Sequence, residues 1–306
     1  MDLPTISVVL PTRDRPEFLV AAARSVLRQR LLPEELVVVD DAGGRGAAEA
    51  LRSLAGCAPV RLRVLSGPGR GPAAARNAGL RAAAGQLIAF LDDDDLWRPE
   101  KLAWQARWFL DRPGLGVLGT HGVRTARPSG RHLRPLAQPG RLREVSRAAL
   151  VRANRLPMSS ALARRECLEE SGGFDEALPL AQDWDLWLRV SARWQLALLP
   201  APLTIHRLHP GQRSQSRAAM RAWEGEVVRR ALAREAGARP LRGVACRRLA
   251  WAHCRLGRGL LRGGETEEAI QELKQAIALW PLQVVAWAGL ARCALARRAV
   301  AGAARG

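Results

Sequence analysis

Tyrosine is absent from this 306-residue chain, and lysine occurs only at Lys101 and Lys274. The formal net charge of +19 therefore comes almost entirely from arginine. Such a charge favours phosphate-bearing partners such as nucleotides, nucleic acid or an anionic membrane surface. Arginine is equally abundant in segments with no other sign of a binding patch, which favours a compositional bias as its main source. No arginine-rich run alternates with aromatic residues as a single-strand binding platform would, so we expect no specific nucleic-acid partner.

Close cysteine pairs and long apolar runs are also missing. The five cysteines are odd in number and lack the paired spacing of a zinc site, which predicts a reducing compartment. They are Cys57, Cys167, Cys246, Cys254 and Cys293. The amino-terminal stretch MDLPTISVVL has neither the basic residues nor the apolar length of a secretory signal. No stretch approaches the roughly 18 apolar residues of a membrane span. We therefore expect a cytoplasmic protein, with any membrane contact peripheral and at the inner face.

Apolar runs and helical patterns alternate over the first third of the chain. The runs, which predict strands, lie at residues 6–10, 36–39 and 87–91, and the alternation of Val60, Leu62 and Val64 with arginines predicts a further strand. Between them, helical patterns begin at Pro16, cover residues 47–55 and end at residues 79–84. Strands separated by helices imply an α/β, Rossmann-like fold, with a mostly parallel sheet covered on both faces.

Polar clusters follow three of these runs, at residues 12–14, 40–41 and 92–95. In open parallel sheets, ligands bind beyond the carboxyl ends of the strands. The last cluster is four consecutive aspartates, whose charges repel one another unless water, a cation or positive groups offset them. Chance would also scatter acids over the helix faces, so we expect a binding site here rather than a solvated acidic loop.

The middle of the chain continues the α/β pattern. Residues 115–123 predict a strand, and residues 124–139, rich in arginine, proline and glycine, predict an exposed loop. A strand at residues 159–163 precedes a short helix and the turn Gly172-Gly173. The segment DWDLWLRVSARW, residues 183–194, has the spacing of an amphipathic helix with Asp183 at its start.

The composition changes after residue 216, which predicts a domain over 1–216, a helical connector over 217–240 and an α-helical tail over 241–306. Counting back from Pro281 along a repeat of about 34 residues places small or apolar residues where a tetratricopeptide repeat needs them. These residues are Leu256, Gly257, Leu260, Ala269, Leu273 and Ala276. A repeat would offer a surface for a protein partner, whereas an ordinary helical hairpin would serve as a cap. The sequence leaves both interpretations open.

Four segments, in this order, resemble the nucleotide-sugar transferases of glycosyltransferase family 2, which have the GT-A fold. They are ISVVLPTRDRP, ELVVVDDAG, GPAAARNAGLRAAAGQLIAFLDDDDLWRPEKL and GGFDEALPLAQDWDLWLRV. The resemblance covers about the first 210 residues. It implies an inverting, hexosyltransferase-type enzyme that moves a sugar from a nucleoside-diphosphate donor, a UDP-sugar by expectation, to a hydroxyl of a glycan, lipid-linked or protein acceptor.

The resemblance also implies roles for the acidic run. A divalent cation, Mg²⁺ or Mn²⁺, suits carboxylate oxygens and would neutralise the leaving diphosphate. In the family's D-x-D motif one acid contacts the ribose and the last binds the metal, which implies Asp94 for the metal and Asp92 or Asp93 for the ribose. Asp95 is expected only to open the next helix. His209 matches a histidine that completes the metal shell, and a lone surface histidine is the alternative for it. The alternative for the acidic run is a solvated turn.

The donor nucleotide would lie against the ends of the first two strands. By resemblance, Pro11, Thr12 and Arg13 line its site, although Arg13 stands where the family often has an aromatic residue. Arginine can also lie flat on a base. Asp40 and Asp41 match the acidic pair that hydrogen-bonds the base and ribose. A turn-stabilising aspartate is the alternative for this pair.

Asp183 matches the aspartate that deprotonates the acceptor hydroxyl in the family. A helix N-terminus favours its ionised form, and helix capping is the alternative role. Gln182 departs from the family's glutamate, which removes a charge beside the predicted base. Arg76 matches a basic position that approaches the donor, with an ordinary surface arginine as the alternative. Acceptor specificity is expected to lie in residues 120–158.

Two other functions are compatible with the sequence alone. Gln182, the altered turn after Asp41 and the partial repeat would suit a non-catalytic binding protein that acts through its helical tail. The net charge of +19 would suit nucleic-acid binding, although no recognisable nucleic-acid module is present.

Overall fold

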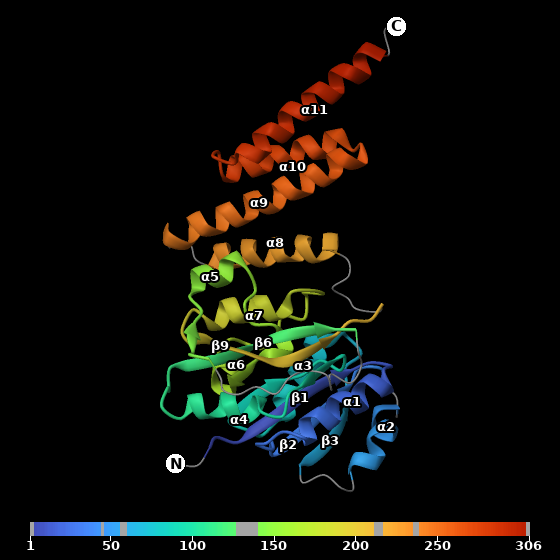
Figure 1. Cartoon of the computed structure of the whole chain (residues 1–306), viewed down its shortest axis with the longest axis vertical. Coiled ribbons are helices and arrows are strands. Elements are labelled where there is room, and N and C mark those ends of the chain that lie inside the picture. The colour runs from blue at the N-terminus through green and yellow to red at the C-terminus, as the bar shows by residue number, and fades with distance from the viewer. Residues whose placement is uncertain are drawn as a thin grey trace. The chain divides into compact units, whose positions relative to one another are not determined.

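The structure is a computed structural model that describes residues 3–43, 46–55, 60–126, 140–210, 217–234 and 239–303. The chain divides into two compact units, Met1–Gln215 and Ser216–Gly306, and Figure 1 labels many of their elements. Among the described residues, no helix has both the length and the apolarity needed to cross a membrane. Cys57 and residues 127–139 of the expected loop lie outside the described residues.

The first unit is built on a mixed sheet with the strand order β3-β2-β1-β4-β8-β6-β9-β5, and β7 pairs with β9. The amino-terminal strands β1 to β4 pair in parallel, as the alternating pattern predicts. The remaining pairs are antiparallel except for β6 with β9. The strands are β1 Ile6–Thr12, β2 Glu35–Asp40, β3 Arg61–Ser66, β4 Leu87–Phe90, β5 Asp95–Trp97, β6 Leu115–Thr125, β7 Arg143–Glu144, β8 Leu162–Arg164 and β9 Gln195–Arg207.

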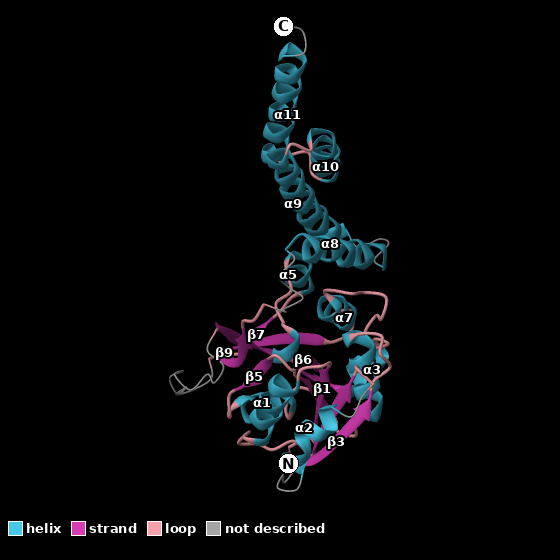
Figure 2. Ribbon diagram, turned by 90° about the vertical axis from the view of Figure 1, so that its right-hand side faces the viewer, coloured by secondary structure: helices cyan, strands magenta, loops and turns pink. Residues whose placement is uncertain are grey.

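Helices cover both faces of this sheet (Figure 2). Alternate residues of β1 point to opposite faces, so Val8 and Leu10 join the core beneath α1, α2 and α4. Val9 faces α3, where Gly79 approaches so closely that a Cβ atom would lie 2.4 Å from Val9 Cγ1. The helices are α1 Pro16–Leu27, α2 Gly46–Ala55, α3 Pro72–Ala82, α4 Lys101–Ala106, α5 Arg147–Arg152, α6 Arg165–Glu170 and α7 Gln182–Val190, with 3-10 turns η1 Arg107–Phe109 and η2 Met158–Ser160.

Two predicted elements are shorter than expected. Ser159 and Ser160 lie in η2 rather than in the strand predicted at 159–163, because their polar groups serve other bonds. The Ser159 carbonyl accepts a hydrogen bond from Trp97 Nε1 (2.7 Å), and the Ser160 hydroxyl donates to the Pro157 carbonyl (2.7 Å). The helix predicted over 183–194 ends at Val190.

The second unit consists of α8 Arg217–Arg234, α9 Arg239–Gly263, α10 Thr266–Leu279 and α11 Val284–Ala303. The chain turns between α9 and α10 at Gly264, whose φ of +86° suits glycine. A Cβ atom on Gly257 would lie 2.8 Å from Leu273 Cγ, so the two helices meet at a residue without a side chain. Ala269, Leu273 and Ala276 form the core of this hairpin. A helical hairpin is therefore present, and its classification as a tetratricopeptide repeat stays a prediction.

Candidate active site

The acidic run forms a tight turn between β4 and β5. The Asp92 backbone N–H donates to Ser159 Oγ (3.1 Å) and the Asp95 N–H donates to the Asp92 carbonyl (3.0 Å). This turn brings one carboxylate oxygen each of Asp92, Asp94 and Asp95 within 4.8 Å of one another. Clustered carboxylate oxygens are the ligands that Mg²⁺ and Mn²⁺ prefer. The donor set therefore fits a divalent cation.

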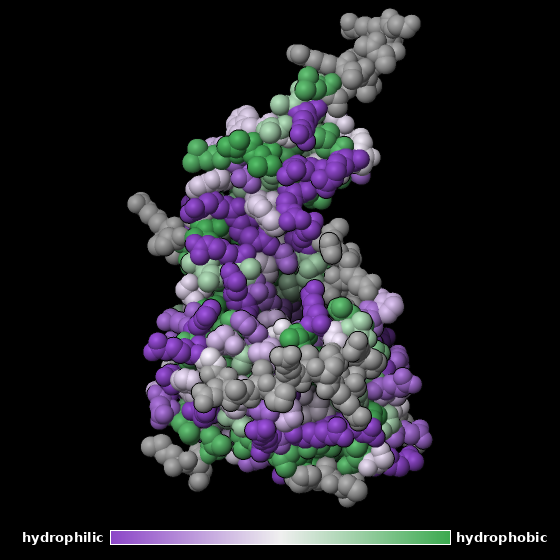
Figure 3. All heavy atoms as spheres, in the orientation of Figure 1, coloured by the Kyte–Doolittle hydropathy of each residue, from purple (hydrophilic) through white to green (hydrophobic). Residues whose placement is uncertain are grey.

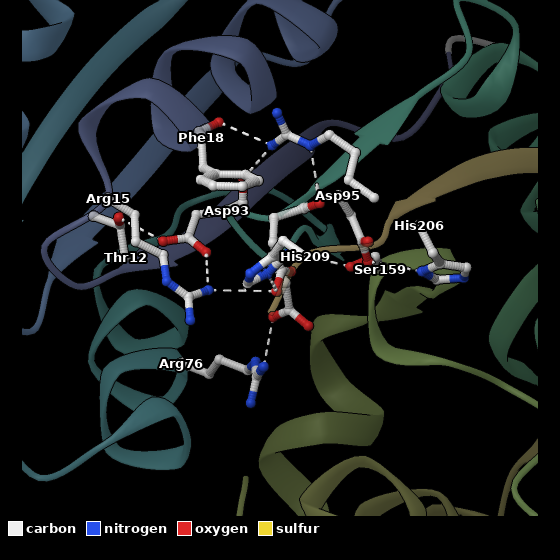
Figure 4. Close-up of polar contacts among 12 residues, drawn as sticks. Thr12, Arg15, Phe18, Arg76, Asp93, Asp95, Ser159, His206 and His209 are labelled. Carbon is white, nitrogen blue, oxygen red and sulfur yellow. Dashed lines mark hydrogen bonds and ion pairs between the residues drawn. The ribbon is translucent and has the colours of Figure 1, made fainter. Parts of the chain in front are cut away.

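Histidines from the end of the first unit stand beside two of these carboxylates (Figure 4). His209 Nε2 lies 3.1 Å from Asp94 Oδ2, so the structure brings together the two predicted metal ligands. Asp95 is buried within β5 and bonds His206 Nδ1 at 2.9 Å. The expectation that Asp95 only opens the next helix is therefore wrong. Burial raises the pKa of Asp95; burial also opposes protonation of His206, but the Asp95 contact outweighs this effect and raises the His206 pKa.

Asp93 points away from this group, toward the end of β1. Its Oδ2 accepts a hydrogen bond from Thr12 Oγ1 (2.8 Å), and Arg15 Nη1 lies 3.4 Å from its Oδ1. Burial is the main reason that the pKa of Asp93 rises to about 6, with the neighbouring Asp94 charge adding to the effect. Of the two acids proposed for the ribose, only Asp92 is part of the carboxylate group suited to a cation.

Arg15 is a site residue that the sequence interpretation missed. Its Nη1 lies 3.4 Å from both Asp93 Oδ1 and Asp94 Oδ2, whereas Arg13 is exposed and lies 4.0 Å from Asp14. Asp14 has a φ of +54°, an uncommon conformation for a residue other than glycine. The turn it makes separates the two arginines, and nothing in the local sequence indicates which one faces the acids.

Arg207 is a second missed residue. Its guanidinium donates to the backbone carbonyls of Asp94 (2.9 Å) and Asp93 (2.6 Å) and lies 4.6 Å from the centre of the Phe18 ring. These bonds fix the backbone of the acidic turn while leaving its carboxylates available. The partners are 113 and 114 residues apart in the sequence, so only the folded β9 brings them together.

Asp40 and Asp41 hold loops at the end of β2. The carboxylate of Asp41 accepts from the backbone N–H groups of Gly69 and Gly71, both at 2.8 Å. Asp40 accepts from Ala42 N–H (3.1 Å) and from Ala47 N–H (3.3 Å) at the start of α2. Both aspartates therefore have the turn-stabilising role that was the alternative for them. Their contact with a nucleotide stays a prediction, as does that of Pro11, which is buried in β1.

Arg76 links the acidic turn to α7. It is 7% exposed, so the interpretation as an ordinary surface arginine is wrong. Its Nη2 contacts Asp92 Oδ1 (2.5 Å), and its Nη1 donates to Gln182 Oε1 (3.0 Å). Gln182 in turn donates from Nε2 to the Leu178 carbonyl (2.6 Å). The amide thus supplies one acceptor and one donor, which a glutamate in the ionised state could not do.

Asp183 lies in the first turn of α7, next to Gln182. The helix cap is Ala181, which has a φ of +57° and no side-chain cap bond, so the interpretation of Asp183 as the cap is wrong. One Asp183 oxygen accepts from Asn154 Nδ2 and the other from Trp184 N–H, both at 2.8 Å. Burial raises the pKa of Asp183 despite these bonds and the Arg76 charge. The sequence led us to expect that the N-terminus of α7 favours the ionised form of Asp183. In the structure, burial of this side chain acts in the opposite direction and has the larger effect on its pKa.

Comparisons with known proteins agree with this geometry. Residues 7–170 match Glycosyl transferase family 2, and the chain belongs to this family. It is 32% identical over 199 residues to the succinoglycan biosynthesis protein ExoO of Rhizobium meliloti, covering 60% of this chain and 55% of ExoO. The chain spans 35% and 55% of the lengths of two of the relatives it matches.

Solved structures show the same GT-A fold. The S. aureus TarS fragment 1-349 in complex with UDP-GlcNAc has a TM-score of 0.65 and 19% identity, with 90% of this chain and 81% of the TarS chain covered. The mannosyltransferase PcManGT of Pyrobaculum calidifontis, in complex with GDP-Man and Mn²⁺, has a TM-score of 0.65 and 23% identity, with 96% and 81% covered. At these identities the likeness concerns the fold alone.

Proposed function

We propose that the protein is a metal-dependent, inverting glycosyltransferase. The observation that carries this proposal is the grouping of Asp92, Asp94 and Asp95 within 4.8 Å at the carboxyl end of a parallel strand, in a chain that belongs to Glycosyl transferase family 2. Asp94 and His209 would hold a divalent cation, which when bound neutralises charge on the leaving diphosphate. Family membership favours this function over a non-catalytic binding protein.

Asp183 is the proposed general base. Its oxygen accepts the proton of the acceptor hydroxyl as that hydroxyl oxygen bonds to the anomeric carbon. The bond from this carbon to the diphosphate oxygen breaks on the opposite face, and the electron pair leaves with the diphosphate. Because burial raises the pKa of Asp183, activity should fall as the pH drops, beginning above the ordinary aspartate range.

A UDP-sugar is the proposed donor. TarS is described in complex with UDP-GlcNAc and PcManGT with GDP-Man and Mn²⁺, so both nucleotides need testing. The carboxylates of Asp40 and Asp41 could accept from a uracil N–H, provided that their present bonds rearrange. The relation to ExoO, a succinoglycan biosynthesis protein, supports a glycan of a cell-envelope polysaccharide as the acceptor. Donor binding would also involve Thr12, Arg76 and Asp92.

Two variants separate binding from chemistry. Asp94→Asn should abolish the Mn²⁺-dependent part of UDP binding, as measured by calorimetry. Asp183→Asn should retain that binding and lose sugar transfer by at least about 100-fold, because the general base is removed. Asp111→Asn, at an exposed position, is the matched control and should change neither property. Retained transfer in Asp183→Asn would contradict the proposed base, and metal-independent binding in the wild type would contradict the cation site.

A further inference from the structure

One face of α9 carries exposed arginines around a tryptophan. We define the arginine stripe as Arg247, Trp251, Arg255, Arg258 and Arg262, all of them exposed. Their spacing along a helix of 3.6 residues per turn places them within roughly 80° of the circumference. Ala250, Cys254 and Gly257 are buried and lie on the neighbouring side of the helix, with Cys254 about 20° from Arg247. The stripe is therefore an exposed side of α9 next to the side that packs on α10, and at one end of it Arg247 lies 4.7 Å from the ring of Trp280, which caps α10.

The positive charge of this stripe is not neutralised within its unit. Helix α9 contains seven arginines and no aspartate or glutamate. No carboxylate of the described residues lies within ion-pair distance of the stripe's four arginines, whereas Arg229 and Arg230 of α8 both pair with Glu226. Compositional bias explains the number of arginines in the chain. It does not explain why Arg248 of the same helix pairs with Glu224 of α8 (2.7 Å), while the stripe has no such partner among the described residues. On the face drawn in Figure 3, hydrophilic residues predominate over α8 and α9.

Trp251 gives the stripe an amphipathic centre. Its side chain is 43% exposed, and the guanidinium carbons of Arg255 and Arg248 lie 4.6 and 5.2 Å from its ring centre. Tryptophan favours the interface between lipid headgroups and water, where its ring is partly buried. Guanidinium groups already lie over the ring, which leaves less of its faces for stacking with nucleic-acid bases. The arrangement favours a lipid surface over a single-stranded nucleic acid.

We propose that the arginine stripe of α9 docks the protein on an anionic lipid bilayer. Guanidinium groups form paired hydrogen bonds with phosphate oxygens, and a row of them attracts a negatively charged surface. Trp251 would lie at the level of the headgroups. This docking does not depend on the proposed sugar transfer, because none of its residues belongs to the first unit.

The experiment uses the full chain and two kinds of vesicle, one of phosphatidylcholine and one of phosphatidylcholine mixed with phosphatidylglycerol. We expect binding to the mixed vesicles alone in a sedimentation assay, and weaker binding as salt rises. The triple variant Arg255→Gln, Arg258→Gln, Arg262→Gln should bind about 100-fold more weakly, since each basic residue at an anionic surface contributes roughly fivefold. Trp251→Phe should lose part of the tryptophan quenching by brominated lipids.

The control removes the same charge from exposed positions of the first unit, with Arg24→Gln, Arg28→Gln and Arg81→Gln. It should leave vesicle binding unchanged, and the circular dichroism of both triple variants should match the wild type. An equal loss in the control would overturn the proposal, because net charge would then suffice. Equal binding to pure phosphatidylcholine would also overturn it. So would a duplex DNA that binds more tightly than the mixed vesicles and loses affinity in the stripe variant. UDP and Mn²⁺ binding in the stripe variant tests the first unit separately.

Discussion

Removing the guanidinium of Arg15 should strengthen cation binding in the absence of nucleotide. Arg15 Nη1 lies 3.4 Å from an oxygen of Asp93 and from an oxygen of Asp94, so its charge offsets part of the negative charge of the acidic turn. A cation that binds Asp94 must either displace this guanidinium or tolerate its repulsion. In Arg15→Ala the carboxylates would be free of that competition.

The magnitude follows from the exposure of the pair. The side chains of Arg15 and Asp94 are 30% and 21% exposed, so solvent weakens the attraction and each contact is worth about 0.5–1 kcal/mol. Only the Asp94 contact competes directly with a cation, because Asp93 lies outside the group of carboxylates that could bind one, and its loss corresponds to roughly twofold to fivefold tighter Mn²⁺ binding. Electron paramagnetic resonance of free Mn²⁺ measures this directly without turnover.

Bound nucleotide should reduce or reverse the gain in Mn²⁺ affinity that Arg15→Ala brings in its absence. A diphosphate bound to the same cation would lie near Arg15, so UDP should enhance Mn²⁺ affinity more in the wild type than in Arg15→Ala. Arg24→Ala removes an exposed arginine of α1 that belongs to no predicted site and should behave as the wild type. Unchanged or weaker Mn²⁺ binding in Arg15→Ala would refute this reasoning, even if Asp94→Asn confirmed the cation site.

Three further predictions concern packing, pH and the proposed base. Gly79→Ala should lower the free energy of unfolding by about 1–3 kcal/mol in urea titrations, because its Cβ would overlap Val9; Gly46→Ala, where a Cβ meets nothing within 4 Å, should not. Burial opposes ionisation of Glu35, but hydrogen bonds from Ser7, the Ala84 N–H and Arg63 outweigh it and lower the Glu35 pKa. The unfolded state therefore takes up the proton first as the pH falls, and stability that is present above about pH 4.5 is lost below it. As the pH is lowered, the melting temperature of Glu35→Gln should fall less than that of the wild type. An equal fall in both proteins would exclude Glu35 as the source of the acid sensitivity. Asn154→Ala removes a hydrogen bond that lowers the Asp183 pKa, so transfer at neutral pH should fall about tenfold and the acid limb of kcat/KM should move to higher pH; an unmoved limb would argue against Asp183 as the base.

The parallel half of the sheet could be predicted because its strands are buried on both faces. Such strands appear as continuous apolar runs, and LVVV in β2 is fully buried in the structure. Proline at Pro16 and at Pro72 begins the helices that follow, which fits its fixed φ and missing N–H. The second half was harder to predict, because short antiparallel strands such as β8 carry three residues and leave too little periodicity to detect.

The direction of each acid in the run LDDDDLW could not be predicted. A run of identical residues gives no periodic signal, and the turn alone decides that Asp93 faces Thr12 while Asp94 faces His209. The partners that stabilise the turn lie far along the chain, with Asp95 and His206 separated by 111 residues. The resemblance to a family indicated which acids matter, and only the fold shows that Arg15 and Arg207 hold them.

Arg76 joins the two chemical halves of the site, and this limits what its substitution can show. It contacts Asp92 in the acidic turn and Gln182 beside the proposed base, and its charge lowers the pKa of Asp183. A variant without Arg76 would therefore change the charge available to a cation and the pKa of the base at once. The two carboxylates that Arg15 contacts, those of Asp93 and Asp94, both belong to the acidic turn. Substitution of Arg15 therefore tests the cation-binding side of the site more directly, whereas loss of activity in an Arg76 variant would be consistent with either failure.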